Sequence, residues 1–542
     1  MENLKDIVEK AEASIPEAPR KIREWILVVL LITALFAFDL VTSNYYPAVW
    51  CDEVLFSEPA VNRVQHGSFT TTVWEYQPAN TFPVINCPLY PLALVPWLAA
   101  IGTSLLAVRT FNYALMALSS FLLWVAAWRF GIVKMPKARL LMLGLFHFGY
   151  GMSFSFRCSR PDILGLSSLL LLFLAFRIEH SRVRYSVLFI LAALTVWIGL
   201  QVALFALLAL AAAWLLFRRT GLREILSLSS GMAIGAGTLV LLLKWKGVLS
   251  YFLPIVIGFM GKHYAHSAHL TVSAKLFRVL RTTLSCYFED FTTVLLTIGI
   301  ITTLTIARSK LSTSTRSLMH YCLVMIFAVP AVFNVVGHYA FYYSYMLFIP
   351  ALFALFAGYS ELSTLPSAES RFSLNLSIFG FIIAAIAVGL PLRLALALSC
   401  GKLVSRSEIQ RIVHTHINRN DIVFSDYAPF FEVKNSADVV YVPYSSFALV
   451  TMASIGGYDF TPEEKRSISV LVIRPQQAAY LSTFFGGQWK PVSEPFGDTQ
   501  DFSKLERLPL VGARLAHYGT QPQTERYQVQ IFRRVAERAG AN

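Results

Sequence analysis

Charged residues are scarce in this chain of 542 residues: only 14% are Asp, Glu, Lys or Arg, whereas 56% are hydrophobic. A soluble globular domain has about 25% charged residues. The mean hydropathy of +0.56 is correspondingly high. A chain of this length with so little charge cannot cover a surface that faces water. The composition therefore excludes a wholly soluble protein and predicts a chain that lipid surrounds over much of its length.

Acidic residues are the scarcer charged kind, with 32 Asp and Glu against 46 Lys and Arg and a net charge of +14. In a soluble protein such an excess would suggest a nucleic-acid partner. In a membrane protein it is typical of cytoplasmic loops, which are rich in Lys and Arg, so we expect no nucleic-acid partner. Six cysteines are too few for a disulfide scaffold. The polar segment 1–23 lacks the short apolar core of a cleavable signal peptide.

Long apolar runs are what the chain has instead. A helix that crosses a bilayer needs about 20 apolar residues, and we count about 11 such runs. They lie near 24–42, 105–128, 140–156, 161–178, 185–200, 201–217, 229–245, 291–307, 318–337, 342–360 and 372–395. Two shorter stretches, 88–101 and 248–260, are typical of interfacial helices. With this count the clusters of Lys and Arg share the side of the N-terminus, which the positive-inside rule makes cytoplasmic.

This topology places loops 43–104 and 246–290 and the tail on the outer side of the membrane. The tail is less apolar than the rest. Its segments "DIVFSDYAPFF", "DVVYVPY" and "ISVLVI" are typical of short strands, and "RSEIQRIVHTHI", "SSFALVTMASI" and "PQQAAYLSTFF" are typical of helices. Strands that alternate with helices indicate an α/β domain. The predicted fold is therefore an all-α polytopic membrane domain over 1–400, followed by a small extracytoplasmic α/β domain over 401–542.

A pair of acidic residues follows the first span. In "PAVWCDEVLF", Asp52 and Glu53 lie just outside the predicted membrane surface. The span does not need them as an anchor, because Tyr45, Tyr46 and Trp50 supply the aromatic residues that favour the interface. Two interpretations follow for Asp52: an N-cap of the next helix, or a catalytic group.

The order of motifs resembles that of GT-C glycosyltransferases of the protein O-mannosyltransferase and lipid A aminoarabinose-transferase kind. After the Asp-Glu pair come Gly67 and Phe69, then "NCPLYPLALVPWLAAIG", and Arg109 opens the next span. Further on, "FRCSRPDILGLSSLLLLF" and "HYAFYYSYMLFIPALFALFA" are similar to the family's later motifs. The resemblance covers most of residues 20–360.

The chain departs from the family pattern at two neighbouring positions. Cys87 stands where many relatives have a proline, and Asn86 stands where the aminoarabinose transferases tend to have a lysine. The identity of the sugar is therefore not carried over from that branch.

The resemblance implies an inverting glycosyltransferase, of the hexosyl- or pentosyltransferase kind, with a sugar on polyprenyl phosphate as its donor. The acceptor would be a glycolipid, a polysaccharide or a protein on the outer face of the membrane. Such a displacement needs one base for the acceptor hydroxyl and positive charge or hydrogen-bond donors on the phosphate. The resemblance implies Asp52 as that base, with Glu53 as its helper. We expect a bacterial inner membrane, with the N-terminus in the cytoplasm and the C-terminal domain and active site in the periplasm.

Further residues are predicted to contact the donor phosphate or the substrate: Arg157, Arg160, Asp162, Arg278, Arg281 and Tyr345. Each has an alternative interpretation. The first two are also typical of arginines that snorkel to the interface, and Asp162 is also typical of an N-cap beside Pro161. Tyr345 also fits an aromatic belt. Arg278 and Arg281, three residues apart on one helical face, fit either a lid over the phosphate or an amphipathic helix on anionic lipid.

No cofactor is required by these motifs, but a divalent cation, Mg²⁺ or Mn²⁺, between Asp52, Asp162 and the phosphate stays open. His263, His266 and His269 are a weaker metal pattern, because no carboxylate or cysteine accompanies them. Two states also stay open for the thiols that flank the first outer loop, Cys51 and Cys87: a disulfide or two unpaired cysteines.

Two other functions compete with the enzyme. A transporter or flippase of lipid-linked sugars would place ionisable residues near mid-bilayer, often in paired repeats, whereas the acidic residues here cluster at the outer surface and the sequence has no internal repeat. A non-catalytic assembly subunit would be marked by loss of the Asp-Glu pair, which is present. Both observations favour the enzyme.

Overall fold

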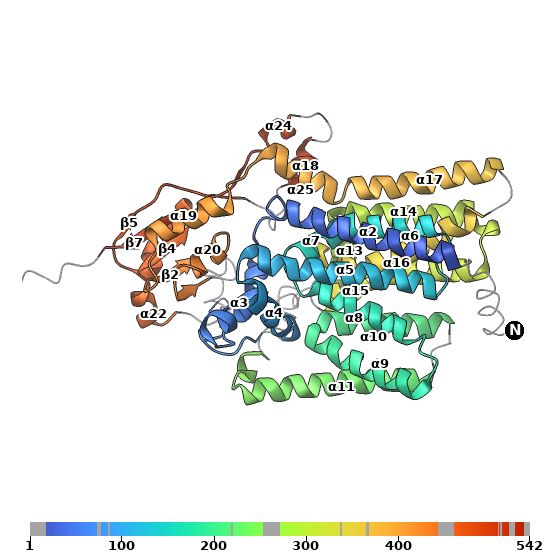
Figure 1. Ribbon diagram of the computed structural model, residues 1–542, viewed down its shortest axis with the longest axis horizontal. Coiled ribbons are helices and arrows are strands. Elements are labelled where there is room, and N and C mark those ends of the chain that lie inside the picture. Colours follow the sequence, from blue (N-terminus) through green and yellow to red (C-terminus); the bar gives the residue numbers. More distant parts are fainter. Residues whose placement is uncertain are drawn as a thin grey trace, which may run out of the picture.

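The computed structural model describes residues 18–72, 77–84, 87–217, 221–252, 271–336, 339–364, 368–442, 460–507, 509, 512–519 and 526–535. A bundle of long helices fills most of it, and a small sheet lies beyond one end of the bundle, which we call the sheet end (Figure 1). Helix α2 begins at the opposite end and runs toward the sheet end. The helical bundle and the C-terminal sheet confirm the predicted fold class.

The bundle helices coincide with the apolar runs of the sequence. They are α2 (Ala18–Thr42), α5 (Leu105–Arg129), α6 (Pro136–Phe148), α7 (Tyr150–Arg157), α8 (Asp162–Ala175), α9 (Ser181–Ile198), α10 (Leu200–Phe217), α11 (Leu222–Trp245), α14 (Phe291–Ile306), α15 (Thr313–Val336), α16 (Tyr345–Leu362), α17 (Ala368–Ala387) and α18 (Leu390–Cys400). Short 3-10 turns, η1 (Arg308–Lys310) and η2 (Phe341–Ser344), precede α15 and α16.

Seven described helices are long and apolar enough to cross a membrane, or eight if the bent pair α7–α8 is one span. Helices α10 and α14 are apolar but shorter, and a shorter helix reaches less far across a bilayer. The chain is thus a multi-pass membrane protein, while the number of 11 spans stays a prediction.

Two breaks interrupt the helices near the sheet end. The run predicted over 140–156 is divided into α6 and α7 at Gly149, where a Cβ atom would lie 2.2 Å from the ring of Phe348. Helices α7 and α8 then meet at an angle of 113°. Ser159, between them, has a φ of 49°, which is unusual for a residue with a side chain. The second break lies in the segment that carries Arg157, Arg160 and Asp162.

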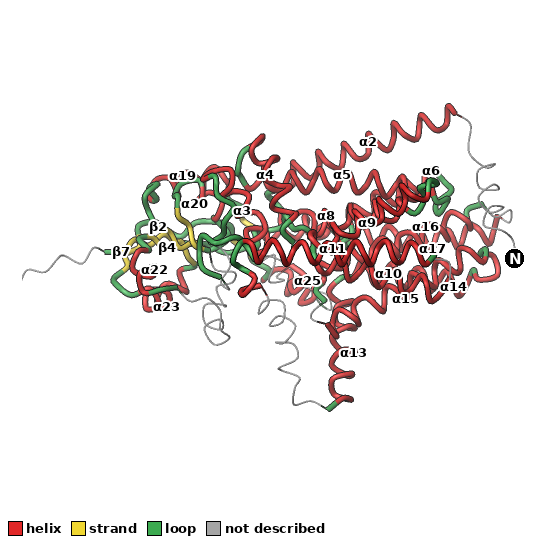
Figure 2. The backbone as a smooth tube through the Cα atoms, turned by 90° about the horizontal axis from the view of Figure 1, so that it is seen from below, coloured by secondary structure: helices red, strands yellow, loops and turns green. Residues whose placement is uncertain are grey.

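Three further helices lie outside the bundle proper. Helices α3 (Cys51–His66) and α4 (Leu89–Ile101) pack together at the sheet end (Figure 1). One end of helix α13 (Val272–Glu289) projects from the bundle in Figure 2, whereas its later residues pack on α15. Helix α3 ends at Gly67, whose φ of 73° suits a residue without a side chain.

The C-terminal region contains a five-stranded sheet with the order β3-β2-β4-β7-β5. The strands are β1 (Gly401–Lys402), β2 (Ile422–Ser425), β3 (Val439–Tyr441), β4 (Val470–Ile473), β5 (Trp489–Pro491), β6 (Thr499–Gln500) and β7 (Gln530–Arg534). The parallel strands β3, β2 and β4 are the three predicted ones, and β7 and β5 pair antiparallel. Strands β1 and β6 form a separate pair.

Helices cover and connect these strands. They are α19 (Arg406–His416), α20 (Phe430–Lys434), α22 (Pro462–Ser467), α23 (Ala478–Phe485), α24 (Ser503–Glu506) and α25 (Gly512–Gly519), with the short turn η4 (Pro475–Gln477). Helices α19 and α23 match two predicted ones, whereas "SSFALVTMASI" lies outside the described residues. The domain boundary at 400/401 stays a prediction.

The sheet region packs on α3. Val54 and Val61 of α3 belong to the same buried apolar cluster as Phe430 and Phe431 of α20. The hydroxyl of Thr72 donates to the carbonyl of Val440 at 2.5 Å. The C-terminal region thus covers the helix whose first turn carries the Asp-Glu pair.

Candidate active site

Three charged side chains from separate motifs meet at the sheet end of the bundle. Arg160 donates through Nη1 to Oδ2 of Asp52 and through Nε to Oδ2 of Asp162, the latter at 2.5 Å. All three residues are buried. The first turn of α3 supplies one carboxylate, and the break between α7 and α8 supplies the arginine and the other carboxylate. We call this group the Asp52–Arg160–Asp162 cluster.

Neither carboxylate of the cluster is an N-cap. Helix α3 has Trp50 as its N-cap and α8 has Pro161, and no side chain caps either helix by a hydrogen bond. The N-cap interpretations of Asp52 and Asp162 are therefore wrong. Both carboxylates instead lie within the first turn, where the helix dipole favours negative charge.

Aromatic rings surround the guanidinium of Arg160. Its Cζ atom lies 4.0 Å from the ring centroid of Tyr342, 5.0 Å from that of Trp50 and 5.7 Å from that of Phe56. Rings at these distances attract a cation and exclude water, and charges interact more strongly where water is excluded. The cluster thus holds two carboxylates and one fixed cation in an apolar setting.

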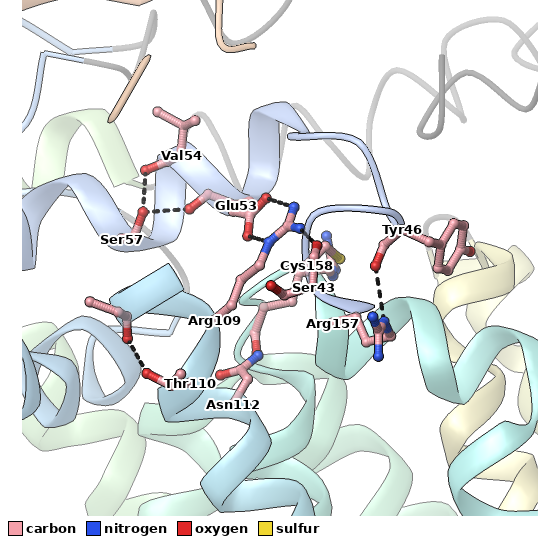
Figure 3. A network of polar contacts seen from close by, with 12 residues as sticks. Ser43, Tyr46, Glu53, Val54, Ser57, Arg109, Thr110, Asn112, Arg157 and Cys158 are labelled. Carbon is pink, nitrogen blue, oxygen red and sulfur yellow. Dashed lines mark hydrogen bonds and ion pairs between the residues drawn. The ribbon is translucent and has the colours of Figure 1, made fainter. Parts of the chain in front are cut away.

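Glu53 points to a different arginine (Figure 3). Arg109 of α5 donates to both of its oxygens, through Nε at 2.7 Å and Nη2 at 2.8 Å, and its Nη1 donates to the carbonyl of Ser43 at 2.5 Å. Such a bidentate pair is strong and has a fixed geometry. Glu53 therefore ties α3 to α5 and to the end of α2, and both of its oxygens are occupied.

Arg157 is also held by the protein itself. Its Nε donates to the carbonyl of Tyr46 at 3.0 Å (Figure 3), its Nη2 donates to the hydroxyl of Thr42 at 2.8 Å, and its Nη1 pairs with Asp39. His147 approaches the same carboxylate at 3.0 Å. Each nitrogen of the Arg157 guanidinium thus has a partner, and this side chain fixes the segment that follows α2.

Sequence reasoning missed the residues that hold the backbone of Arg160. The hydroxyl of Tyr90 donates to Oδ1 of Asn112 at 2.9 Å, and Nδ2 of Asn112 donates to the carbonyl of Arg160 at 2.9 Å. Tyr90 is the tyrosine of the "PLYP" element, so that motif was the available signal. Asn112 lies one turn after Arg109 on α5 and carried no signal of its own.

Buried polar atoms next to the cluster have few partners among the described residues. Oγ of Ser159 has none, and Oδ1 of Asp162 and the hydroxyl of Tyr345 have only each other. Buried polar atoms in folded proteins nearly always have a partner, in protein or in water. These atoms therefore indicate a place for water or for polar atoms of a ligand. Tyr345 was predicted as a substrate contact, and its hydroxyl lies in this group.

Arg278 and Arg281 are not brought to the cluster. Among the described residues, no hydrogen bond or ion pair joins either of them to it. One end of α13 projects from the bundle (Figure 2), while Thr283 and Tyr287 bond to α15. The apolar residues of α13 are exposed as well: Leu276 is 66% exposed and Phe277 is 67% exposed. An amphipathic helix with an uncovered apolar face is typical of a helix that lies on lipid.

The described residues contain no group of three or more His, Cys, Asp or Glu side chains that would hold a metal ion. Asp52 and Asp162 are both paired with Arg160, whose guanidinium takes the position that a cation between them would need. The two carboxylates therefore do not fit a divalent cation in this arrangement, and the cation stays a prediction. The histidines at 263, 266 and 269, and Asn86, lie outside the described residues.

The disulfide that the sequence left open is not formed. The thiol of Cys87 is buried and free. Cys51 instead approaches the catalytic candidate beside it, with its Sγ 3.8 Å from Oδ1 of Asp52.

A further buried carboxyl lies where α3 meets the sheet region. Oε1 of Glu58 accepts hydrogen bonds from Nδ2 of Asn62 at 2.6 Å and from the backbone N–H of Thr72 at 3.1 Å, and the hydroxyl oxygen of Thr72 also lies 3.1 Å from it. Burial raises the pKa of Glu58 above its ordinary value, against the opposing charge of Lys434. Burial also lowers the pKa of Lys434. This interface thus holds two poorly solvated charges, whereas each carboxylate of the cluster has an arginine.

No protein-family model matches the chain, and no curated protein matches it in sequence. Solved structures match it in fold. ArnT from Cupriavidus metallidurans bound to undecaprenyl phosphate has a TM-score of 0.52 at 12% identity, over 95% of this chain and 99% of that one. The archaeal oligosaccharyltransferase AglB from Archaeoglobus fulgidus, in complex with an inhibitory peptide and a dolichol-phosphate, has a TM-score of 0.50 at 10% identity, over 86% and 71%. The chain therefore has the GT-C fold that the resemblance predicted.

Proposed function

We propose that this chain, which has the GT-C fold, is an inverting glycosyltransferase that moves a sugar from a polyprenyl-phosphate donor to an acceptor hydroxyl. The observation that carries this proposal is the buried Asp52–Arg160–Asp162 cluster, which combines a base with a phosphate-binding cation at the ends of three helices. The similar structures contain undecaprenyl phosphate and dolichol-phosphate. These ligands support a polyprenyl phosphate as the carrier here.

Asp52 is the base in this mechanism. It takes the proton of the acceptor hydroxyl while the hydroxyl oxygen attacks the anomeric carbon, on the face opposite the phosphate. The new bond joins that oxygen to the anomeric carbon, the bond from this carbon to the phosphate oxygen breaks, and the configuration inverts. The phosphate departs as a stable anion and needs no strong acid. Asp52 suits this role better than Glu53, because Arg109 occupies both oxygens of Glu53.

Arg160 is the contact to the donor phosphate. A guanidinium matches the geometry of phosphate oxygens, and Asp162 holds this one in place through Nε. An incoming phosphate competes with Asp52 for the guanidinium. A carboxylate that loses its arginine partner binds a proton more readily, so donor binding makes Asp52 a better base. Tyr345 hydrogen bonds to the phosphate through its buried hydroxyl.

Glu53 and Arg157 act as positioning residues in this mechanism. Their partners are Arg109 and Asp39, and these two ion pairs fix α3 and the end of α2 around Asp52. Direct phosphate contacts by Arg157, Arg278 and Arg281 stay predictions, since none of them contacts the cluster in the described chain. The divalent cation also stays a prediction, and transfer measured with and without EDTA tests it.

The acceptor in this proposal is a glycolipid, a polysaccharide or a protein that reaches the sheet end. We place that end on the outer face of a bacterial inner membrane, with the N-terminus in the cytoplasm. The C-terminal region packs on α3, so it borders the side from which the acceptor approaches Asp52.

Transfer of labelled sugar tests the proposal. Membranes with the wild type or Asp52→Asn receive a mixed pool of polyprenyl-phosphate sugars, and labelled products are separated. We expect transfer by the wild type and a loss of about 10²–10⁴-fold in Asp52→Asn, the range for removal of a general base. Asp438→Asn, the same change at a carboxylate whose side chain is 47% exposed, serves as the control.

Two outcomes contradict the proposal. Full transfer by a folded Asp52→Asn variant would show that the mechanism is wrong. Absence of transfer from every donor by the wild type would favour the transporter or flippase.

A further inference from the structure

A hollow lies away from the cluster, with α4 on one side and the helix pair α9–α11 on the other. Its volume is about 950 Å³. Val95 of α4, Trp197 of α9 and Leu242 of α11 contribute to its walls, and Phe69 and Phe82 contribute from the chain between α3 and α4. The lining is thus largely apolar, and we call this hollow the α4–α11 groove.

Helical spacing explains the two apolar walls. Leu92, Val95 and Pro96 are separated by three and four residues, which places them on one face of α4. Across the groove, the indole Nε1 of Trp197 donates to the carbonyl of Gly235 and to the hydroxyl of Thr238, both at 3.1 Å. These bonds fix the polar edge of the indole on α11 and leave its ring to form part of the wall.

The charged lining residues are of one sign. Arg63 near the end of α3 and Lys246 after the end of α11 line the groove, and no acidic residue does. Both side chains are exposed, and neither forms an ion pair within the described chain, while Nη1 of Arg63 donates to the carbonyl of Gly67. The Nζ atom of Lys246 lies 5.8 Å from the ring centroid of Phe82. An anion at this position would meet two cations, with apolar surface beside them.

One wall of the groove belongs to a membrane-spanning helix, α11. On α11, Leu241 is 65% exposed and Trp245 is 77% exposed. Tryptophan and lysine are enriched at the membrane interface, so this helix end marks the level of the lipid headgroups. Leu242 lies one turn before Lys246 and therefore deeper in the hydrocarbon. A molecule that enters here comes from the bilayer and has its charge above its apolar part.

We propose that the α4–α11 groove binds an anionic phospholipid. The lipid phosphate lies between Arg63 and Lys246, and an acyl chain lies along Val95 and Leu242. This site is separate from the sugar-transfer site, because Arg63 lies about three turns beyond Asp52 on α3, roughly 16 Å at 1.5 Å per residue. A bound lipid holds the far end of the helix that carries the base.

Native mass spectrometry of the detergent-purified full chain tests this site. Phosphatidylglycerol and phosphatidylcholine are titrated separately into the wild type and into a variant with Arg63→Gln and Lys246→Gln. We expect the wild type to prefer phosphatidylglycerol, and the double variant to bind it at least about 10-fold more weakly, because it loses charge-assisted hydrogen bonds to the phosphate. Lys244→Gln, an exposed lysine two residues away that does not line the groove, should bind like the wild type.

A third variant tests the shape of the groove while the two cations stay in place. Val95→Trp keeps both cations but fills part of the groove, and it should also lose phosphatidylglycerol. A melting curve of each variant confirms that it is folded. Equal binding of phosphatidylglycerol by the wild type and the double variant would overturn the proposal, as would equal binding of both lipids by the wild type. Undecaprenyl phosphate is titrated in parallel. If the double variant loses binding only of undecaprenyl phosphate, the groove belongs to the donor and the proposal is overturned. None of these readouts depends on sugar transfer.

Discussion

Arginine has opposite surroundings in two regions of this molecule. At the sheet end, Arg109, Arg157 and Arg160 are buried, and each is paired with a carboxylate. On α13, Arg281 is exposed and Arg278 is half-buried, beside exposed apolar residues. The sequence predicts that arginines of both regions contact the donor phosphate. A position near the membrane surface therefore does not by itself separate these arginines, whereas the partners of their side chains do.

The three buried arginines also differ among themselves. All the nitrogens of Arg109 and Arg157 bond to groups that hold helices together. Arg160 alone among them bridges two carboxylates, and it follows Ser159, whose buried hydroxyl has no partner among the described residues. We therefore expect the first two to matter for folding and the third to matter for transfer.

The largest effect on stability is expected for Arg109→Met. The substitution leaves Glu53 buried without its partner, which costs about 3–5 kcal/mol of unfolding free energy. Thermal unfolding in detergent measures the loss. Arg419→Met is the matched control, because its pair with Asp438 is 81% and 47% exposed and exposed pairs contribute about 0–1 kcal/mol. Equal melting temperatures for the two variants would contradict a structural role for the buried pair.

Arg160→Lys should affect transfer more than folding. Lysine keeps the charge but loses the planar fork that reaches both carboxylates and the phosphate. We expect sugar transfer to fall by about 10²-fold, the range for removal of one donor to a developing anion, with a melting temperature close to that of the wild type. Arg278→Lys, the same change on α13, is the control. A variant that unfolds, or one with full transfer, would argue against a role for Arg160 in phosphate binding.

The sequence predicted the helices well, because bilayer-spanning helices are long and apolar. The family resemblance also singles out Asp52, Arg160 and Asp162, whose side chains meet in the structure, while their catalytic and binding roles stay predictions. It did not predict which arginine meets which carboxylate. In a straight helix Arg157 and Arg160 would share a face, but the 113° bend between α7 and α8 sends one to Asp39 and the other to Asp52.

Tertiary contacts explain the other differences as well. No local pattern relates Asn112 to the backbone of Arg160, since 48 residues separate them. The edge strand β5 has only three residues and includes a proline, so its alternation is too short to be recognised in the sequence. Strand β7 ends with two arginines, which weaken its apolar pattern, and one of them, Arg533, pairs with Asp421.

Glu58 differs from the buried carboxylates discussed above, because it has no arginine partner among the described residues. Burial raises its pKa above the ordinary value of 4.5. The folded state then binds this proton more tightly than the unfolded state, so stability decreases as the pH rises from 4.5 through the raised value. Glu58→Gln should remove this dependence and raise stability at neutral pH. Melting curves across this range test it, with exposed Glu463→Gln as the control, and an unchanged pH slope would contradict it.

The smallest effect is expected on α13. Arg278→Gln together with Arg281→Gln should leave transfer in detergent within about twofold of the wild type, because neither arginine bonds to the cluster. On vesicles rich in anionic lipid, a purified α13 peptide with the same two substitutions should lose about 1 kcal/mol of attraction per arginine. The loss is measured as faster release of this peptide from the vesicles. A large loss of transfer in detergent would instead revive the lid over the phosphate.

In the proposed mechanism, the guanidinium of Arg160 leaves Asp52 and binds the donor phosphate. Asp52 is then free to act as the base. The most direct measurement compares donor binding with transfer, using purified protein and the polyprenyl-phosphate sugar that the wild type accepts. We predict that Asp52→Asn binds this donor at least as tightly as the wild type, because a competitor for Arg160 is gone, yet transfers almost no sugar. An Asp52→Asn protein that no longer binds the donor, or that binds it and still transfers sugar at the wild-type rate, would contradict the claim.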